Sequence, residues 1–263
     1  MIQSVDRAAR ILRVLGSGTP GLGVTEIADR LGLAKPTVHG LLRTLEQSGL
    51  VSQDVGTGKY FLGPGVLQLG NAFLAGSELR ARSMMRAAAL SQQVNEAVWV
   101  ATLAGDDVMV IHHEFRPDDA VQILEVGATI PWHACALGHA IVAFRDEHEA
   151  EELLTQPLRP LTGRTRTEPE VLRKALTGVR DKGVAVENQE ANVGDAGIAA
   201  PVFDHTGHAI GSLGVVGPAD RMLTRTAKAS LGRAVVETAR AVSREMGASR
   251  AQPRGGVTTH GRA

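Results

Sequence analysis

The chain has 263 residues, of which 43% are hydrophobic, so it is long enough to form one large domain or two ordinary ones with packed cores. Its 28 basic and 28 acidic residues give a formal net charge of zero. This excludes a protein that binds nucleic acid through an overall positive charge, so any affinity for DNA must come from a local arrangement of charged residues. The single cysteine, Cys135, excludes an intramolecular disulfide and a cysteine-based zinc finger.

The first predicted helix begins near Ser4, a residue type that is favoured at helix N-caps. Five apolar residues follow at helical spacing, namely Val5, Ala8, Ile11, Leu12 and Leu15. Because this polar amphipathic helix starts almost at once, we expect no signal peptide. No stretch reaches about 18 uninterrupted apolar residues, so we also expect no membrane span and predict a reducing cytoplasm as the compartment.

Residues 24–50, which follow a loop rich in Gly and Pro, have the pattern of two short helices joined by a tight turn. The first covers residues 24–31, with Thr25 as its expected N-cap, and Gly32 follows it. The second runs over residues 36–47 and has an apolar side formed by Val38, Leu41, Leu42 and Leu45. Its opposite side carries small and polar residues, namely Pro36, His39, Gly40, Arg43 and Gln47. Such a face suits a helix that enters the major groove of DNA.

A short hairpin is predicted after these helices. Leu50 and Val51 start a strand, residues 55–58 have the composition of a hairpin tip, and residues 59–62 form the return strand. Three helices and a two-stranded hairpin make a winged helix-turn-helix. Charge gives this interpretation little support, because residues 1–63 hold seven Lys or Arg and five Asp or Glu, a net charge of only +2.

The pattern changes beyond the break at residues 63–65. A linker helix is predicted over residues 66–74 and a longer helix over residues 78–94. Strands are predicted at residues 97–103, 108–115, 121–126, 184–186, 197–203 and 209–216. Further helices are predicted at residues 133–144, from the capping-box start at 167–170 to residue 181, and at residues 223–246.

Strands flanked by helices, without a long parallel repeat, predict an α+β fold with a single antiparallel sheet of the GAF/PAS-like kind. The predicted organisation has four parts. These are a winged helix-turn-helix domain over residues 1–63, a linker helix over 64–76, a larger α+β domain over 77–247 and a disordered tail over 248–263.

Seven segments in order along the chain form one pattern. In the N-terminal part they are Ser4–Ala8, Thr25–Ala28, Lys35–His39 and Lys59–Gly63. In the C-terminal part they are Pro131–Gly138, residues 183–194 and Ile198–Val202. This pattern resembles the IclR family of bacterial transcription regulators over residues 2–246. One position departs from it, because His139 stands where the family usually has lysine, and this weakens any inference about the charge of a ligand.

One further segment narrows the resemblance. Residues 112–119 and 124–128 are similar to the corresponding part of the glycerol operon regulators of actinomycetes within that family.

The resemblance implies that the N-terminal domain binds operator DNA. The candidate contact residues are Thr25, Lys35, Pro36, Thr37, His39, Gly40, Arg43, Thr57 and Lys59. Arginine is the best reader of guanine, and the two wing residues are placed for phosphate or minor-groove contacts. The alternative interpretation is an ordinary solvated helix face.

The resemblance also implies that the C-terminal domain holds a small metabolite between the sheet and its loops. The corresponding positions are Gln122, Ala136, Leu137, Glu187, Asp195, Gly197, Gly214 and Val216. The polar members can hydrogen-bond to hydroxyl groups, and the small ones leave room. Two carboxylates disfavour a dianion, so glycerol fits this set better than glycerol 3-phosphate. The alternative is that each position serves only packing or loop structure.

A metal or enzyme site is the competing hypothesis. His112, His113, Asp118, Asp119 and His133 are of metal-ligating type. Neighbouring strand residues point to opposite faces, however, so the first two histidines should not share a site, and no His-Glu-x-x-His spacing exists. Cys135 and His139 are four residues apart and could face each other on a helix, but a buried cysteine is the simpler account. We therefore expect no catalytic residue, no metal and no cofactor.

Taken together, the sequence predicts a homo-oligomeric, ligand-responsive transcription regulator that binds a pseudo-palindromic operator as paired winged helices. The predicted output is repression of a catabolic operon, with glycerol metabolism as the candidate, relieved by a metabolite such as glycerol or glycerol 3-phosphate. The alternatives are a cytoplasmic metal-assisted hydrolase with an accessory helix-turn-helix, and a structural DNA-binding protein without a ligand. Dimer or tetramer, and repressor or activator, stay open.

Overall fold

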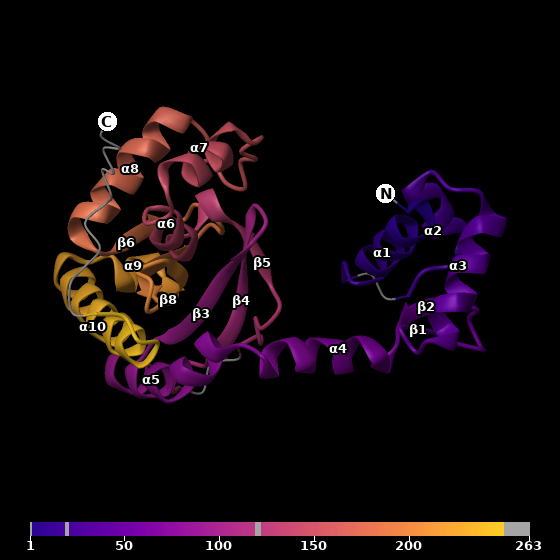
Figure 1. Ribbon diagram of the computed structural model, residues 1–263, viewed down its shortest axis with the longest axis horizontal. Coiled ribbons are helices and arrows are strands. Elements are labelled where there is room, and N and C mark those ends of the chain that lie inside the picture. The colour runs from indigo at the N-terminus through magenta and orange to yellow at the C-terminus, as the bar shows by residue number, and fades with distance from the viewer. Residues whose placement is uncertain (1, 19–20, 119–121, 250–263) are drawn as a thin grey trace, which may run out of the picture. The chain divides into compact units, whose positions relative to one another are not determined.

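The computed structural model describes residues 2–18, 21–118 and 122–249 (Figure 1). The chain divides into two compact units, residues 1–76 and residues 77–263. Each unit has its own buried core and is described by itself. In the described residues, no helix is both long enough and apolar enough to cross a membrane.

The first unit is a winged helix-turn-helix, as the sequence predicts. Its elements are α1 (Gln3–Leu15), α2 (Val24–Leu31), α3 (Lys35–Gln47), β1 (Val51–Gln53), β2 (Tyr60–Leu62) and α4 (Pro64–Ala75). The two strands are antiparallel, with Val51 opposite Leu62. Ile11 of α1, Ile27 of α2 and Val38 of α3 are completely buried against one another and the wing, so the helical spacing of apolar residues forms the core.

Two predicted helix caps are wrong. Helix α1 begins at Gln3, so Ser4 lies inside its first turn and does not cap it. Helix α2 is capped at Gly23, and Thr25 lies inside the helix. The side chain of Glu26 accepts a hydrogen bond from the backbone N–H of Gly23 at 2.8 Å, and its charge lies at the positive end of the helix. The side chain of Glu26 therefore satisfies the backbone at the start of the helix, the role that was expected of Thr25.

Helix α4 carries apolar side chains that no other described residue of the first unit buries. None of its residues is buried, and Leu67, Leu69 and Phe73 are 67%, 63% and 53% exposed. An apolar helix of 12 residues with no buried face is unusual in a folded chain, since most helix stability comes from burial of one face.

The second unit is an α+β domain built on one antiparallel sheet. Its helices are α5 (Glu78–Val94), the 3-10 turn η1 (Trp132–Ala134), α6 (Ala136–Val142), α7 (Glu147–Thr155), α8 (Pro169–Lys182), α9 (Ala219–Met222) and α10 (Arg225–Glu245). Its strands are β3 (Ala97–Ala104), β4 (Asp107–Glu114), β5 (Thr129–Pro131), β6 (Ala185–Asn188), β7 (Asp195–Phe203) and β8 (Ala209–Pro218). The strands lie side by side in the order β5-β4-β3-β8-β7-β6. The predicted fold class is confirmed.

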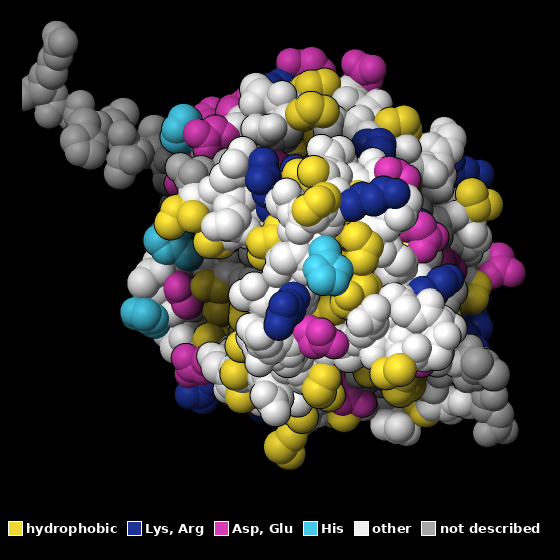
Figure 2. All heavy atoms as spheres, turned by 90° about the vertical axis from the view of Figure 1, so that its right-hand side faces the viewer, with side chains coloured by type: hydrophobic (Ala, Val, Ile, Leu, Met, Phe, Trp, Pro, Cys, Tyr) yellow, Lys and Arg dark blue, Asp and Glu magenta, His cyan; other side chains and the backbone are white. Residues whose placement is uncertain are grey.

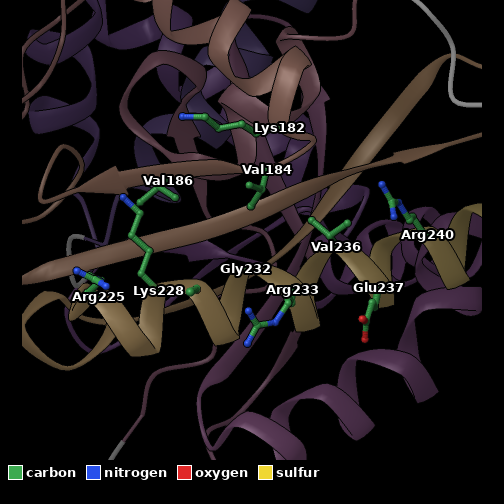
Figure 3. A pocket seen from close by; sticks show the side chains of 11 residues that line it. Lys182, Val184, Val186, Arg225, Lys228, Gly232, Arg233, Val236, Glu237 and Arg240 are labelled. Carbon is green, nitrogen blue, oxygen red and sulfur yellow. The ribbon is translucent and has the colours of Figure 1, made fainter.

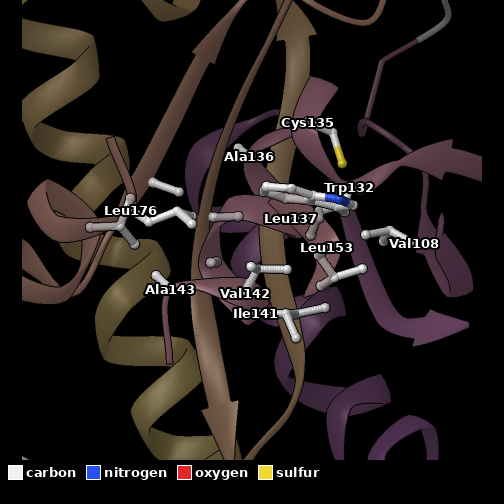
Figure 4. Packing of buried hydrophobic residues seen from close by; sticks show 14 of the residues in the cluster. Val108, Trp132, Cys135, Ala136, Leu137, Ile141, Val142, Ala143, Leu153 and Leu176 are labelled. Carbon is white, nitrogen blue, oxygen red and sulfur yellow. The ribbon is translucent and has the colours of Figure 1, made fainter. Parts of the chain in front are cut away.

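Helices cover both faces of this sheet. Helices α5 and α10 pack together on one face, and α6 packs on the other, with α7 and α8 behind it (Figure 1). Every residue of α6 is buried. Figure 4 shows Leu137 and Ile141 of α6 in one buried cluster with Trp132, Val108 of β4 and Leu153 of α7. This helix is the centre of the domain core.

The predicted helix over residues 133–144 is interrupted. Residues 132–134 form η1, Cys135 is extended, and α6 starts only at Ala136. Gly138 explains how the two pieces fit, because a Cβ atom at this position would lie 2.1 Å from the carbonyl oxygen of Trp132. The chain folds back over its own helix, which only glycine permits.

The predicted strand at residues 121–126 is wrong where the structure describes it, from residue 122. Residues 122–128 have no strand, and the edge of β4 pairs instead with Thr129–Pro131. The apolar side chains of Ile123 and Leu124 are exposed, so burial of side chains does not stabilise a paired strand at this place. Helix α7 has no counterpart among the predicted helices. Of the predicted tail, residues 250–263 lie outside the described residues, as does Asp119.

We expect Gly138→Ala to destabilise the protein by roughly 2–4 kcal/mol, because its methyl group must displace the Trp132 backbone. Urea unfolding monitored by circular dichroism measures this. Gly178→Ala on α8 is the matched control, since nothing lies within 4 Å of its added Cβ. That variant should gain about 0.5–1 kcal/mol from helix propensity. Equal stability of the two variants would contradict the packing described here.

Candidate functional site

Seven of the nine predicted DNA-facing residues are exposed in the first unit, and the other two are half-buried. Val38, Leu42 and Leu45 anchor the inner side of α3 in the core. The outer side leaves Lys35, Pro36, His39, Gly40 and Arg43 exposed, with Thr37 half-buried beside them, and Thr25 is exposed at the start of α2. A Cβ built on Gly40 would meet nothing within 4 Å. Because glycine has no side chain, another molecule can approach the helix backbone closely at this position.

Charge on this surface is mixed. Figure 2 shows Lys and Arg side chains interspersed with acidic, apolar and histidine side chains rather than gathered into one basic patch. This agrees with the small positive charge counted in the sequence of the N-terminal domain. A duplex bound at this surface would be recognised through the shape of the helix and its specific side chains more than through a strong electrostatic field.

The wing tip is organised by Asp54. Its Oδ1 atom accepts hydrogen bonds from the backbone N–H and the hydroxyl of Thr57, at 2.7 and 2.6 Å, and these bonds hold the pKa of Asp54 below its usual value. The Thr57 hydroxyl is thus already hydrogen-bonded within the tip. Lys59, which is half-buried directly before β2, is therefore the charged wing residue that remains a candidate for contact with DNA.

In the second unit, the register of the sheet brings predicted effector positions together. Glu187, Gly197 and Val216 are direct cross-strand neighbours on β6, β7 and β8, and Gly214 lies two residues from Val216 on the same face. A Cβ at Gly197 would lie 3.2 Å from the Cβ of Ala136 on α6 and 3.4 Å from Glu187. Small residues therefore let α6 approach this part of the sheet closely.

Glu187 has the most perturbed carboxylate of the set. It is only 5% exposed, and it accepts a hydrogen bond from the backbone N–H of Glu190 at 3.0 Å. Burial raises its pKa to about 7, and the nearby charges of Glu190 and Asp195 act in the same direction. A carboxyl group that titrates near neutrality beside small residues is a functional-site candidate.

A charged cluster that the sequence analysis missed adjoins Glu187. The Arg166 side chain donates two hydrogen bonds to the buried Glu190, from Nη2 at 2.6 Å and from Nε at 2.8 Å, and the same Nη2 atom lies 3.5 Å from Nδ1 of His139. Nε2 of His139 bonds to the carbonyl of His133 at 2.8 Å. Burial, followed by the Arg166 charge, lowers the pKa of His139 to about 4, so this imidazole is neutral.

Two unpaired ring nitrogens lie on the same face of the sheet. Trp99 is the cross-strand neighbour of both Gly214 and His113. The backbone N–H of Glu125 donates to Nδ1 of His113 at 3.2 Å, which assigns the ring proton to Nε2 because burial lowers the pKa of this histidine. Trp99 Nε1 and His113 Nε2 are buried, and neither has a hydrogen-bond partner within the described chain. They are donors available to a polar ligand.

The remaining predicted positions are less suited to a ligand. The side-chain amide of Gln122 is occupied by the backbone N–H and carbonyl of Arg116, at 2.7 and 2.9 Å, so it orders its own loop. Leu137 belongs to the apolar core around α6. Neither of the two cavities described below is lined by any of the eight predicted effector residues. Beside Glu187, α6 instead packs closely on the sheet, with Ala136 against Gly197.

Nothing in the described residues supports a metal or nucleophile site. Across residues 2–18, 21–118 and 122–249, no group of three His, Cys, Asp or Glu side chains is placed to hold an ion. His112 bonds to Glu114 at 2.8 Å, and His133 bonds to the carbonyl of Arg159 at 3.0 Å. Burial raises the pKa of the Cys135 thiol to about 12, which keeps it protonated and unreactive.

A winged helix-turn-helix joined to an α+β domain defines a class of ligand-responsive transcription regulators. Residues 4–55 match the model of the IclR helix-turn-helix domain, and residues 71–244 match that of the bacterial transcriptional regulator IclR C-terminal domain. The chain belongs to the IclR family of bacterial transcription regulators. Family membership confirms the predicted regulator, and it gives no support to the hydrolase alternative.

Named relatives and solved structures agree with this assignment. The chain is 44% identical to the glycerol operon regulatory protein of Streptomyces griseus and 41% identical to that of Streptomyces coelicolor, over 95% of this chain and 98% of each relative. An IclR transcriptional regulator from Alicyclobacillus acidocaldarius superimposes with a TM-score of 0.82 at 29% identity, covering 94% of this chain and all of the other. An IclR homolog from Microbacterium hydrocarbonoxydans, solved with 4-hydroxybenzoate, shares the fold with a TM-score of 0.77 at 22% identity, over 93% of this chain and 99% of that one.

The raised pKa of Glu187 predicts a pH-dependent stability difference. Because its pKa is higher in the folded than in the unfolded chain, its contribution is fully present below about pH 4.5 and is lost as pH rises through about 7. Glu187→Gln removes this term. Relative to the wild type, the variant should therefore gain roughly 1–3 kcal/mol between pH 5 and pH 8. Thermal unfolding at both pH values measures the difference.

Asp181→Asn, which changes an exposed carboxylate on α8, is the control for this measurement. A difference between Glu187→Gln and wild type that stays constant from pH 5 to pH 8 would show that Glu187 is already ionised at low pH.

Proposed function

We propose that this protein represses a glycerol catabolic operon and is released from its operator by a small neutral polyol, with glycerol as the first candidate. The observation that carries the proposal is the pair of relatives named glycerol operon regulatory protein, each matched over 95% of this chain. The proposed compartment is the cytoplasm, where the operator lies.

The side chains around Glu187 support a neutral polyol as effector. Glu187 and Asp195 offer acceptors for hydroxyl groups, and the unpaired nitrogens of Trp99 and His113 offer donors on the same face of the sheet. The positive charge of Arg166 is already neutralised by its double hydrogen bond to Glu190. A phosphate ester would bring two negative charges close to the carboxyl groups of Glu187 and Asp195, which would repel them. We therefore favour glycerol over glycerol 3-phosphate.

Binding at this face requires α6 to separate from the sheet, since the position of a Gly197 Cβ lies within 3.2 Å of Ala136. The effector would bind only the separated arrangement and so shift the equilibrium between two packings of α6. We propose this movement as the signal that lowers operator affinity.

Two copies of the chain are needed to bind a pseudo-palindromic operator. The exposed apolar side chains of Leu67, Leu69 and Phe73 on α4 support a homo-oligomer, because a second copy would remove them from water. The proposed DNA contacts of each copy are the exposed residues of α3, with Thr25, Thr57 and Lys59 at its margins.

Arg43→Ala should weaken operator binding by about 1–3 kcal/mol, because the lost guanidinium faces outward from α3 and can contact a base or a phosphate. A gel-shift titration at fixed salt measures the change, and the thermal unfolding temperature should stay constant. Arg13→Ala removes an exposed arginine from α1, outside the proposed face, and is the matched control. Unchanged operator affinity in Arg43→Ala would place the recognition surface elsewhere.

Glycerol should release the wild-type protein from DNA upstream of its own gene and the neighbouring operon, and glycerol 3-phosphate should not. Glu187→Ala should bind the same DNA with wild-type affinity and lose the response to glycerol, because an acceptor for the hydroxyl groups is removed. Asp181→Asn is the control with an intact response.

The outcomes of this gel shift separate the parts of the proposal. Specific binding that neither compound releases would discard the glycerol assignment. Loss of both DNA binding and response in Glu187→Ala would assign that residue a folding role.

A further inference from the structure

A hollow lies beside the edge strand β6, on the face opposite to Glu187. It is a cavity of about 520 Å³ between strand β6 and helix α10. Strand β6 pairs only with β7 in the six-stranded sheet, so its outer edge is open. Val184, directly before β6, and Val186 of β6 face Gly232 and Val236 of α10 across the hollow (Figure 3). We call this hollow the β6 groove.

The floor of the β6 groove is apolar and has space for a ligand. A Cβ built on Gly232 would meet nothing within 4 Å, although the residue sits in the middle of α10 and is only partly exposed. The volume of the β6 groove lies within the range of about 300–1,000 Å³ that is typical of small-molecule sites. An apolar floor next to an open helix position favours a ligand with a compact hydrocarbon or aromatic body.

The rim of the β6 groove is strongly basic. Five cationic side chains line it, namely Lys182, Arg225, Lys228, Arg233 and Arg240, and Glu237 is the single acidic residue among the lining residues. None of the five cations makes a side-chain hydrogen bond or an ion pair that is resolved in the described chain. Figure 3 shows Lys228 reaching from α10 toward Val186, while Glu237 points away from the strand. In a chain with no net charge, this local excess of unpaired cations predicts an anionic partner.

The β6 groove also extends toward the charged cluster on the opposite face. A neighbouring cavity of about 390 Å³ shares Lys182, Val184, Val186 and Lys228 with it and continues along β6 to Arg166 and His139. Lys182 and Lys228 therefore face both hollows, and they are the cations best placed to hold the head of an anion whose body lies over Gly232.

We propose that the β6 groove is a second small-molecule site, separate from the Glu187 face, which binds an amphipathic organic anion with an apolar body and a carboxylate or phosphate head. The apolar floor and open Gly232 position accept the body, and Lys182 and Lys228 bind the head. The size of the hollow favours a small molecule over a protein segment, which would need a longer surface. This site does not depend on the identity of the effector at Glu187.

A fluorescence titration with 1-anilinonaphthalene-8-sulfonate tests the proposal, because this probe combines fused rings with one anionic group. N-phenyl-1-naphthylamine has the same rings without the sulfonate and is the uncharged comparison. Wild-type protein should bind the anionic probe with an affinity that falls as salt rises, and bind the neutral one about tenfold or more weakly.

Two variants locate the binding. Gly232→Leu fills the open position over the floor and should abolish the component of binding that lies in the groove, while helix propensity keeps α10 folded. Gly70→Leu, at an equally open helix position in α4, is the matched control and should bind as wild type does. Lys182→Ala combined with Lys228→Ala should weaken the probe about tenfold or more, whereas Lys35→Ala with Lys59→Ala should not.

Displacement then identifies the chemical source of the head group. Benzoate displacing the probe assigns a carboxylate, and phenyl phosphate displacing it assigns a phosphate ester; displacement by neither would overturn the proposal. Probe binding that is equal in wild type and Gly232→Leu, or equal for both probes, would also overturn it. So would a loss of oligomer mass in Gly232→Leu, measured by sedimentation velocity, without any loss of probe binding, because the groove would then be an interface between copies.

Discussion

The packing of α6 against the sheet controls the chemistry of the titratable groups beside it. This helix of seven residues has no exposed residue, and it reaches the sheet because Gly197 presents no side chain and because Gly138 admits the backbone of Trp132. Water is thereby excluded from Glu187, His139 and Cys135, and burial is the largest cause of each of their pKa shifts. A small change in the position of α6 would change the charge state of its surroundings, which is what a ligand-controlled domain needs.

The two faces of strand β6 have opposite chemistry because successive side chains of a strand point to opposite sides. Glu187 faces α6, on the side of the sheet that carries carboxylates and unpaired N–H donors. The carboxylates can accept hydrogen bonds from hydroxyl groups, so this side suits a neutral polar molecule. Val186, one residue earlier, faces the basic groove along α10, which suits an anion with an apolar body. Arg166 lies between the two, since it binds Glu190 and also lines the cavity that continues the groove.

The DNA-binding unit relies on shape more than on charge. The core of Ile11, Ile27 and Val38 fixes the relative positions of α1, α2 and α3, and the outer face of α3 is left with small and polar side chains. Asp54 even places a negative charge in the wing tip, where it orders the turn through Thr57. In the proposed complex with DNA, discrimination comes from a few direct contacts, and the small net charge limits non-specific attraction.

The sequence alone determined the features that depend on local periodicity. The helical spacing of Val38, Leu42 and Leu45 predicted the orientation of α3, and the order of motifs predicted the family and the α+β fold. Tertiary structure decided the rest, because burial and pairing join residues that are distant in sequence. Arg166 lies in a stretch of sequence without periodicity, yet its side chain compensates the charge of Glu190. Trp99 looks like an ordinary strand residue in the sequence, yet the register of the sheet places it beside Gly214 and His113. The expected strand at residues 121–126 is wrong for the same reason: four of its six residues are apolar, but the fold gives Ile123 and Leu124 no apolar surface to cover them.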